Sequence, residues 1–209
     1  MVMKLHCFGE SGNAYKCALA LELAGEPWEP VHVDFFRGAT RAPAFRALNV
    51  MGEVPVLEDG ETVLTQSGAI LDYISTVTGK LGGKLAADRR EVLRWILFDT
   101  QKVSGMAGPL RFQMNFLPEE KRDPAVAAFL SGRLHSALKI METHLADREW
   151  LVGDGVTIAD CACCGYLYYD EDFTFDRVQY PAIDAWLSRL SALPGWKHPY
   201  ELMTRAFPG

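Results

Sequence analysis

The N-terminal part of the chain alternates strand-like stretches with helical ones. Apolar and polar residues alternate from Met3 to Cys7 and again from Trp28 to Val33, which is the two-residue period of a β-strand. Between these stretches a glycine-containing turn precedes apolar residues at helical spacing: Ala14, Cys17, Ala18 and Leu21. This order predicts a strand, a helix and a second strand, with the two strands parallel through a right-handed crossover.

The next stretch predicts an antiparallel hairpin and a helix. Asp59-Gly60 separates Val54–Glu58 from Glu61–Leu64, and an Asp-Gly pair between two strand-like runs is the strongest local signal for a hairpin. Ser67 is placed as the N-cap of the following helix. The expected buried stripe of that helix is Ile70, Leu71, Ile74 and Val77. A small mixed α/β sheet domain is therefore expected.

Beyond Asp88 the apolar period is that of helices throughout. The expected buried stripes are Val92, Trp95 and Ile96; Val126, Phe129, Leu130, Leu134, Leu138 and Met141; Ala159, Ala162, Cys163 and Tyr166; and Ile183, Trp186, Leu187 and Leu190. Thr157 with Asp160 three residues later predicts a variant of the capping box. Gly79–Ala87 is rich in glycine without a strand pattern. We therefore expect an α/β domain over 1–79, a linker over 80–87 and an all-α domain over 88–209.

Composition narrows the classes of partner. The 209 residues are 49% hydrophobic and 23% charged, as in globular proteins, and the formal net charge is −6. Such a charge argues against nucleic acid and against an anionic membrane surface as partners. No stretch approaches the length of a membrane span, and the N-terminus runs directly into a strand pattern, so a cytoplasmic protein is expected.

The cysteines are few, odd in number and clustered: Cys7, Cys17, Cys161, Cys163 and Cys164. They do not form a disulfide framework, so reduced thiols are expected. The three cysteines of 161–164 lack the spacing and further ligands of a metal site, and core positions are expected for them. No metal is expected.

Three short motifs carry a family resemblance. Ser11-Gly12-Asn13, Gly52–Leu57 and Gln66–Leu71 resemble, in order and spacing, the glutathione-site motifs of the cytosolic glutathione S-transferase family. Trp95–Asp99, Arg111-Phe112 and Val156–Asp160 match that family's helical domain as well. The resemblance implies a thioredoxin-like N-terminal domain, an all-helical C-terminal domain and a homodimer. The Ser-Gly-Asn-x-x-Lys run is most similar to bacterial nu-like members of the Ser/Asn type.

The resemblance implies where glutathione, the expected co-substrate, binds. Glutathione needs donors for its carboxylates, a negative group for its ammonium and extended backbone for pairing. Gln66-Ser67 opens a helix, whose N-terminus attracts a carboxylate, and the resemblance assigns this place to the γ-glutamyl group. Alternatively, Ser67 only caps its helix. Pro55 cannot donate to a strand ladder. The family holds this bond cis, which leaves Val54 for the cysteinyl backbone; the alternative is an edge-strand proline.

The thiol is the reacting group of glutathione. Lowering its pKa from about 8.5 by about two units requires near 2.7 kcal/mol of thiolate stabilisation. The resemblance places this activation at Ser11 and Asn13, on the loop before the first helix, and leaves open which of them dominates. Either residue could instead only cap the helix. Cys7 is a rival nucleophile, but it shares the buried face of its strand with Met3 and Leu5, which favours a structural thiol.

Three charged residues are further candidates for binding glutathione. Asp99 continues an apolar stripe and needs a partner, either the glutathione ammonium across a dimer or a local cation. Arg41 is a candidate for the glycyl carboxylate, or is solvated. Glu53 occupies a position where many relatives carry Lys or Gln, and its negative charge would repel that carboxylate.

These features together predict a glutathione transferase. The enzyme would stabilise the glutathione thiolate and direct it at a small apolar electrophile or a mixed disulfide, with peroxidase or disulfide reductase activity included. The second substrate and the dimer contacts are expected on the all-α domain. The alternative is a non-catalytic binding or regulatory module of the same fold, because fold does not fix function.

Overall fold

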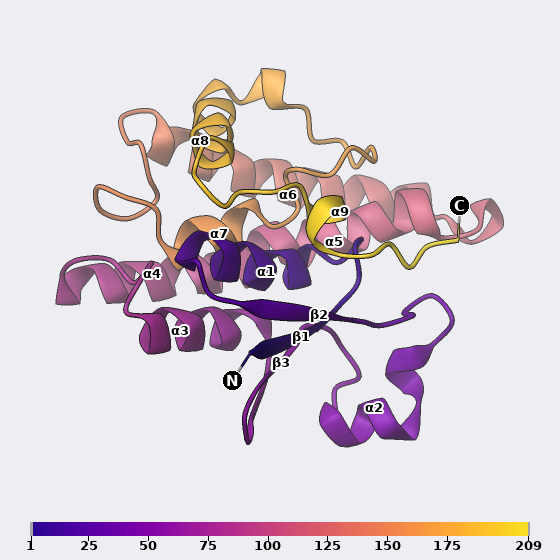
Figure 1. Cartoon of the computed structure of the whole chain (residues 1–209). Coiled ribbons are helices and arrows are strands. Elements are labelled where there is room, and N and C mark those ends of the chain that lie inside the picture. Colours follow the sequence, from indigo (N-terminus) through magenta and orange to yellow (C-terminus); the bar gives the residue numbers. More distant parts are fainter. Residues whose placement is uncertain (1, 209) are drawn as a thin grey trace. The chain divides into compact units, whose positions relative to one another are not determined.

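The computed structural model of the chain describes residues 2–208, and its helices and strands are labelled in Figure 1. The described residues divide into two compact units. The first comprises the residues up to Gly82 together with those from Pro194 onward, and the second comprises Gly83–Leu193. Each unit has its own buried core.

The first unit contains a mixed sheet of four strands in the order β2-β1-β3-β4. The strands are β1 (Met3–Cys7), β2 (Trp28–His32), β3 (Val56–Asp59) and β4 (Thr62–Thr65). β1 is parallel to β2 and antiparallel to β3, and β3 and β4 form an antiparallel hairpin. The hairpin turns at Gly60, whose φ of 61° is left-handed. The predicted mixed α/β sheet is confirmed.

Helices accompany the sheet within this unit: α1 (Gly12–Ala24), α2 (Pro43–Leu48), α3 (Ser67–Thr78) and the short α9 (Pro199–Leu202), with a 3₁₀ turn at Ala39–Arg41. α1 and α3 pack against each other and against strands of the sheet, and α2 lies apart from that pair (Figure 1). Ile70, Leu71 and Ile74 of α3 are fully buried as expected, but Val77 is 48% exposed. Val77 was wrongly placed in the core because apolar spacing alone does not fix the width of the buried stripe.

Among the residues that the structure describes, the second unit contains helices and connecting loops but no strand. Its helices are α4 (Ala86–Phe98), α5 (Ser104–Arg111), α6 (Pro124–Leu145), α7 (Ile158–Cys164) and α8 (Pro181–Ser191). π-helical turns at Asp99–Val103 and Phe112–Phe116 flank α5, and 3₁₀ turns lie at Glu119–Lys121 and Arg177–Gln179. The predicted all-α part of the fold is confirmed.

The cores of these helices follow most of the expected stripes. Trp95 of α4 and Trp186 of α8 are 2% and 0% exposed. In α6, however, Val126 and Phe129 are 44% and 64% exposed, so they were wrongly placed in the core. The capping box at Thr157 is present, since the side chain of Asp160 accepts from the backbone N of Thr157 at 2.8 Å.

The compact units differ from the expected domain ranges at the C-terminal end. Residues 80–87 hold the transition between units, close to the expected linker, but the residues from Pro194 onward cluster with the first unit. The reason is that α9 packs on α1. Within residues 2–208, no helix has both the length and the apolar character needed to cross a membrane.

Candidate functional site

Strand register brings the three sequence motifs to one edge of the sheet. His6 of β1 pairs with Val56 of β3, and Val56 pairs with Thr65 of β4. The loop after β1, the segment before β3 and the segment after β4 therefore leave the sheet at the same edge. These segments contain the Ser11, Val54-Pro55 and Gln66-Ser67 motifs respectively.

Ser11 is the N-cap of α1. Its Oγ accepts a hydrogen bond from the backbone N of Ala14 at 3.2 Å, and its own N donates to the O of Phe8 at 3.1 Å. The cap uses an acceptor lone pair of the hydroxyl, so its hydrogen remains a donor. Ser11 is 7% exposed. The expected capping alternative therefore holds and is compatible with donation to a ligand.

Asn13 lies in the first turn of α1 rather than on the preceding loop, where the sequence analysis placed it. Its Oδ1 accepts from Nζ of Lys16 at 2.9 Å. Lys16 is only 1% exposed, which is unusual for an ammonium group. Because Oδ1 faces this cation, the amide Nδ2 is the group that Asn13 offers elsewhere.

Lys16 was not among the candidate residues predicted from the sequence, and its contact with Asn13 adds it to the candidate site. The available signal was a lysine inside an otherwise apolar run, Ala14–Leu21, in a helix that the structure buries on nearly every side.

Cys17 connects the first turns of two helices. Its Sγ lies 3.7 Å from the backbone O of Asn13 in α1 and 3.7 Å from the backbone O of Ser67 in α3. The N-termini of α1 and α3 are therefore adjacent. Burial raises the pKa of the Cys17 thiol, so this sulfur stays protonated and acts as a weak donor.

Gln66, not Ser67, is the N-cap of α3. Its φ of 68° and ψ of 117° turn the chain into the helix, and its side chain makes no capping bond within the described residues. Ser67 is the first helical residue, so the expectation that it caps the helix was wrong. A non-glycine residue at positive φ is strained, and such strain clusters at binding sites.

The side chain of Gln66 contacts the loop before β3. Its Nε2 donates to Oε2 of Glu53 at 3.3 Å and lies 3.0 Å from Sδ of Met51. Asn49 is 3% exposed and holds this loop, since its Nδ2 donates to the O of Glu53 at 2.8 Å and its Oδ1 accepts from the N of Met51 at 3.0 Å. Asn49 was not among the predicted residues, because nothing in the local sequence pattern marks a buried amide. Glu53 is thus placed beside the N-terminus of α3.

The peptide bond between Val54 and Pro55 is cis, as the resemblance implies. Pro55 is buried and Val54 is half-buried, and both precede the first residue of β3.

The remaining candidates lie in different surroundings. Arg41 is exposed at the end of a 3₁₀ turn, and the carbonyl of the neighbouring Thr40 would lie 2.9 Å from a Cβ added at Gly52. This turn therefore borders the Glu53 loop. Asp99 is 1% exposed within the helical unit, and its Oδ1 accepts from Oγ of Ser104 at 2.7 Å.

Cys7 is 1% exposed, and burial raises its pKa to about 12. A thiol with this pKa is protonated at neutral pH, which supports the structural interpretation of Cys7. Cys161, Cys163 and Cys164 are likewise buried.

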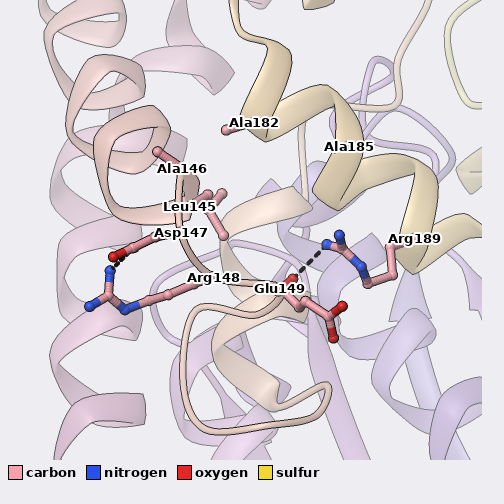
Figure 2. A pocket seen from close by; sticks show the side chains of 8 residues that line it. All are labelled: Leu145, Ala146, Asp147, Arg148, Glu149, Ala182, Ala185 and Arg189. Carbon is pink, nitrogen blue, oxygen red and sulfur yellow. Dashed lines mark hydrogen bonds and ion pairs between the residues drawn. The ribbon is translucent and has the colours of Figure 1, made fainter.

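The helical unit has a hollow of about 300 Å³ between the C-terminal end of α6 and α8 (Figure 2). Both of its arginines are engaged with their surroundings: Arg148 pairs with Asp147, and Arg189 donates to the backbone O of Glu149 at 2.8 Å. None of the site residues predicted from the sequence lines it.

Comparisons with known proteins show which family the chain belongs to. Residues 1–76 match the family model described as "Glutathione S-transferase, N-terminal domain", and residues 108–194 match "Glutathione S-transferase, C-terminal domain". Glutathione S-transferase 3 of Zea mays is 34% identical over 163 residues, which are 76% of this chain and 73% of that protein. The chain belongs to the glutathione S-transferase family. Its N-terminal sheet is accordingly the thioredoxin-like part of that fold.

Solved structures support this family assignment. A possible glutathione S-transferase from Rhodopseudomonas palustris is 35% identical, with a TM-score of 0.87 over 95% of this chain and 98% of that one. A glutathione transferase from Burkholderia graminis, solved with two glutathione molecules bound per subunit, is 26% identical, with a TM-score of 0.84 over 97% of this chain and 87% of that one.

A further sequence relative is a longer protein. Elongation factor 1-gamma 3 of Oryza sativa subsp. japonica is 31% identical over 173 residues, which are 81% of this chain and 41% of that protein.

Proposed function

We propose that this glutathione S-transferase binds glutathione where the N-termini of α1 and α3 meet at the sheet edge, and stabilises its thiolate there. One observation carries the proposal: the sulfur of Cys17 lies 3.7 Å from the carbonyls of both Asn13 and Ser67. Two helix N-termini side by side present free backbone N–H groups and two positive dipole ends to an anionic ligand. Glutathione brings both a carboxylate and a thiolate.

The γ-glutamyl group is assigned to the start of α3. The backbone N–H groups of the first turn and the hydroxyl of Ser67 are donors for its carboxylate, and Gln66 is positioned beside them. The ammonium and the carboxylate sit on the same carbon of this group, so a negative side chain must lie near the same helix end. Glu53, 3.3 Å from the amide of Gln66, supplies that charge. In this position Glu53 attracts the ammonium rather than repelling the glycyl carboxylate.

The thiolate is assigned to the start of α1. The hydroxyl of Ser11 keeps a hydrogen to donate, and the cation of Lys16 turns the amide Nδ2 of Asn13 away from itself. Both donors, together with the dipole of α1, stabilise S⁻ more than SH, which lowers the thiol pKa. We assign the larger share to Ser11 and a supporting share to Asn13.

The rest of the tripeptide follows from the resemblance. Val54, ahead of the β3 ladder and followed by the buried Pro55, is proposed to pair with the cysteinyl backbone. Arg41, on the turn that borders the Glu53 loop, is proposed for the glycyl carboxylate. Asp99 is buried and accepts a hydrogen bond from the hydroxyl of Ser104, which is a neutral partner and not the expected local cation. Because its carboxylate is buried within the helical unit, we propose a structural role for Asp99 and not a role in binding the ammonium.

The second substrate is proposed to be a small apolar electrophile or a mixed disulfide, bound by residues of the helical domain. In a mixed disulfide between glutathione and a second thiol, the glutathione thiolate attacks the glutathionyl sulfur. The new S–S bond gives oxidised glutathione, and the second thiol leaves as a thiolate. The relative from Burkholderia graminis holds two glutathione molecules per subunit, and the Ser-Gly-Asn-x-x-Lys run supports a nu-like subtype for this chain. Both points favour glutathione-dependent disulfide chemistry in the cytoplasm.

A homodimer is also proposed, through exposed apolar residues of the helical unit. Leu93 and Leu97 on α4 are 55% and 62% exposed, and Phe129 and Ile140 on α6 are 64% and 55% exposed. Large apolar side chains exposed on the surface of helices are candidates for an interface. Sedimentation should show a dimer, and Leu97→Glu should shift it to monomer. Val178→Glu, at a residue 88% exposed outside these helices, is the matched control. A wild-type monomer at micromolar concentration contradicts the proposal.

Titration of bound glutathione tests the proposed function. Thiolate absorbance should show a pKa well below the free value of about 8.5. Binding with an unshifted thiol pKa would favour the alternative, a non-catalytic binding or regulatory module. Conjugation, peroxide reduction and disulfide reduction, assayed side by side on one preparation, identify the reaction.

A further inference from the structure

Glu10 is a buried carboxylate, 4% exposed. It directly precedes Ser11, the proposed hydrogen-bond donor to the glutathione thiolate. Three of the donors to Glu10 come from one segment near the end of the chain. Oε2 accepts from the backbone N of Ala206 at 2.9 Å, and Oε1 accepts from the backbone N of Phe207 at 3.2 Å and from Nε of Arg205 at 3.4 Å. We call residues 204–207 the strap.

The strap also binds the backbone of the Ser11 loop. The N of Gly9 donates to the O of Thr204 at 2.7 Å. A Cβ added at Gly9 would lie 3.0 Å from the O of Met203, 3.0 Å from the ring of Tyr200 and 3.1 Å from Cα of Arg205. The chain from Tyr200 to Arg205 therefore packs closely on this loop, and any side chain at position 9 would have to displace these neighbours by a few tenths of an ångström.

Aromatic packing anchors the far end of the strap. The ring of Phe207 packs edge-on against that of Phe36, with 4.8 Å between the ring centroids. The ring of Phe36 in turn packs against those of Phe35 and Phe8, at centroid distances of 5.2 and 6.0 Å. Phe8 directly follows β1 and accepts, through its O, the hydrogen bond from the N of Ser11. The strap thus contacts Gly9 and Glu10 directly and Phe8 through Phe36, so it packs on the segment that leads into Ser11. Figure 1 shows this C-terminal segment in yellow after α9, which packs on α1.

The charge of Glu10 does not favour thiolate formation directly. A negative group near a thiol raises the thiol pKa, so a catalytic contribution from its charge would have the wrong sign. Instead, three N–H groups of the strap donate hydrogen bonds to its carboxylate, and the negative charge strengthens these bonds. A buried carboxylate that accepts several hydrogen bonds from one segment holds that segment in a defined position.

We propose that Glu10 is a positioning residue for thiolate activation: by holding the strap against the Gly9–Ser11 loop, it fixes the direction of the Ser11 hydroxyl. This inference rests on the proposed function of Ser11. A donor displaced by a fraction of an ångström from its acceptor loses much of its effect on the transition state. Loss of the strap therefore acts on the thiol pKa while the γ-glutamyl end of the site, at α3, is left in place.

The test compares Glu10→Ala, Glu10→Gln and Ser11→Ala with the wild type. In Glu10→Ala the bound thiol pKa should rise by about half a unit to one unit. If the wild-type bound thiol has a pKa near 6.5, kcat at neutral pH should then fall about 1.5- to threefold, with KM for glutathione within about twofold. Glu10→Gln keeps one carbonyl acceptor and should give an intermediate shift. A lowered pKa in Glu10→Gln would show that the charge acts directly on the sulfur and would overturn the proposal.

Hydrogen exchange supplies a second readout. The amides of Ala206 and Phe207 should exchange faster in Glu10→Ala than in the wild type, and unchanged exchange there overturns the proposal. Glu22→Gln is the matched control, because Glu22 pairs with Lys197 at 3.0 Å near the opposite end of α1. It should leave the thiol pKa unchanged.

The Ser11→Ala arm separates two failures. If Ser11→Ala shifts the thiol pKa and Glu10→Ala does not, the positioning role of Glu10 is wrong and the proposed function stands. If neither variant shifts it, the proposed role of Ser11 is wrong, and so is the positioning role of Glu10 that rests on it. If both shift it, the double variant should shift it no further than Ser11→Ala alone, because Glu10 acts through Ser11.

Discussion

Replacing Ser11 with alanine removes a proposed donor to the thiolate and a helix cap together. A hydrogen bond to a charged group contributes about 1.5 to 3 kcal/mol, which corresponds to a rise in thiol pKa of about one to two units. If the bound thiol has a pKa near 6.5, the thiolate fraction at pH 7 falls from roughly three quarters to between roughly a quarter and 3%. The rate at neutral pH should therefore fall about 3- to 25-fold, and the dipole of α1 and the amide of Asn13 remain to limit the loss.

The pH dependence of kcat/KM measures this effect. In Ser11→Ala the rising limb should move to higher pH by the shift in thiol pKa, and the rate should recover at alkaline pH, where the thiol ionises without help. KM for glutathione should change little, because the γ-glutamyl contacts at α3 are untouched. Loss of the 3.2 Å bond to Ala14 should also cost about 1 kcal/mol of stability, or a fall in Tm of about 2 to 4 °C. Ser11→Thr keeps the hydroxyl and the cap, and is the control for both effects.

Other outcomes would refute parts of the reasoning. A wild-type profile in Ser11→Ala with a shifted profile in Asn13→Ala would exchange their roles. If neither variant shifts the profile and Cys7→Ala abolishes activity, the protein uses a cysteine of its own. Because burial raises the pKa of Cys7 to about 12, we expect Cys7→Ala to stay active at neutral pH.

Further variants test other parts of the site and the fold. Gln66→Ala and Ser67→Ala should each raise KM for glutathione about 10- to 100-fold with a smaller change in kcat, because their contacts are present equally in the ground and transition states; unchanged affinity in both would mean that the site is misplaced. Lys16→Met, close in length but uncharged, should raise the bound thiol pKa by releasing the amide of Asn13, and an unchanged thiol titration would contradict that role. Asp160→Ala should destabilise the protein by about 3 kcal/mol or more in thermal denaturation, because Asp160 is fully buried and accepts from the backbone N of Leu151 and Thr157 and from Trp186; a Tm within a degree or two of the wild type would contradict this.

Local patterns predicted the elements that local physics specifies. The alternation of apolar and polar residues predicted β1, and the Asp59-Gly60 pair predicted the hairpin. The helical spacing of apolar residues predicted that α1 ends near Gly25, whose left-handed conformation closes the helix. These signals act over a few residues and are visible in one sequence. The cis bond at Pro55, in contrast, came from the family resemblance, since an X-Pro pair alone favours trans.

The features that the sequence did not reveal depend on distant parts of the chain. The positive φ of Gln66 has no local signal, since a glycine would be the expected residue there. The apolar character of Val126 and Phe129 predicted a core, yet these residues are exposed, and apolar spacing cannot distinguish a core from a surface that another chain covers. The hydrogen bonds of Glu10 join residues almost 200 positions apart. Only the folded chain brings such groups together.

Charge explains why the site is built from helix ends and isolated side chains. The chain carries a net charge of −6, so its overall field does not attract a tripeptide that is itself anionic. Attraction must come from groups whose effect is short-ranged: the backbone N–H groups at the starts of α1 and α3, and the buried cation of Lys16. Interactions made at contact distance are screened far less by salt than those that act beyond a Debye length of about 8 Å. Glutathione affinity should therefore vary little with ionic strength, and a steep decrease with salt would instead indicate that long-range attraction by exposed cations such as Arg41 dominates binding.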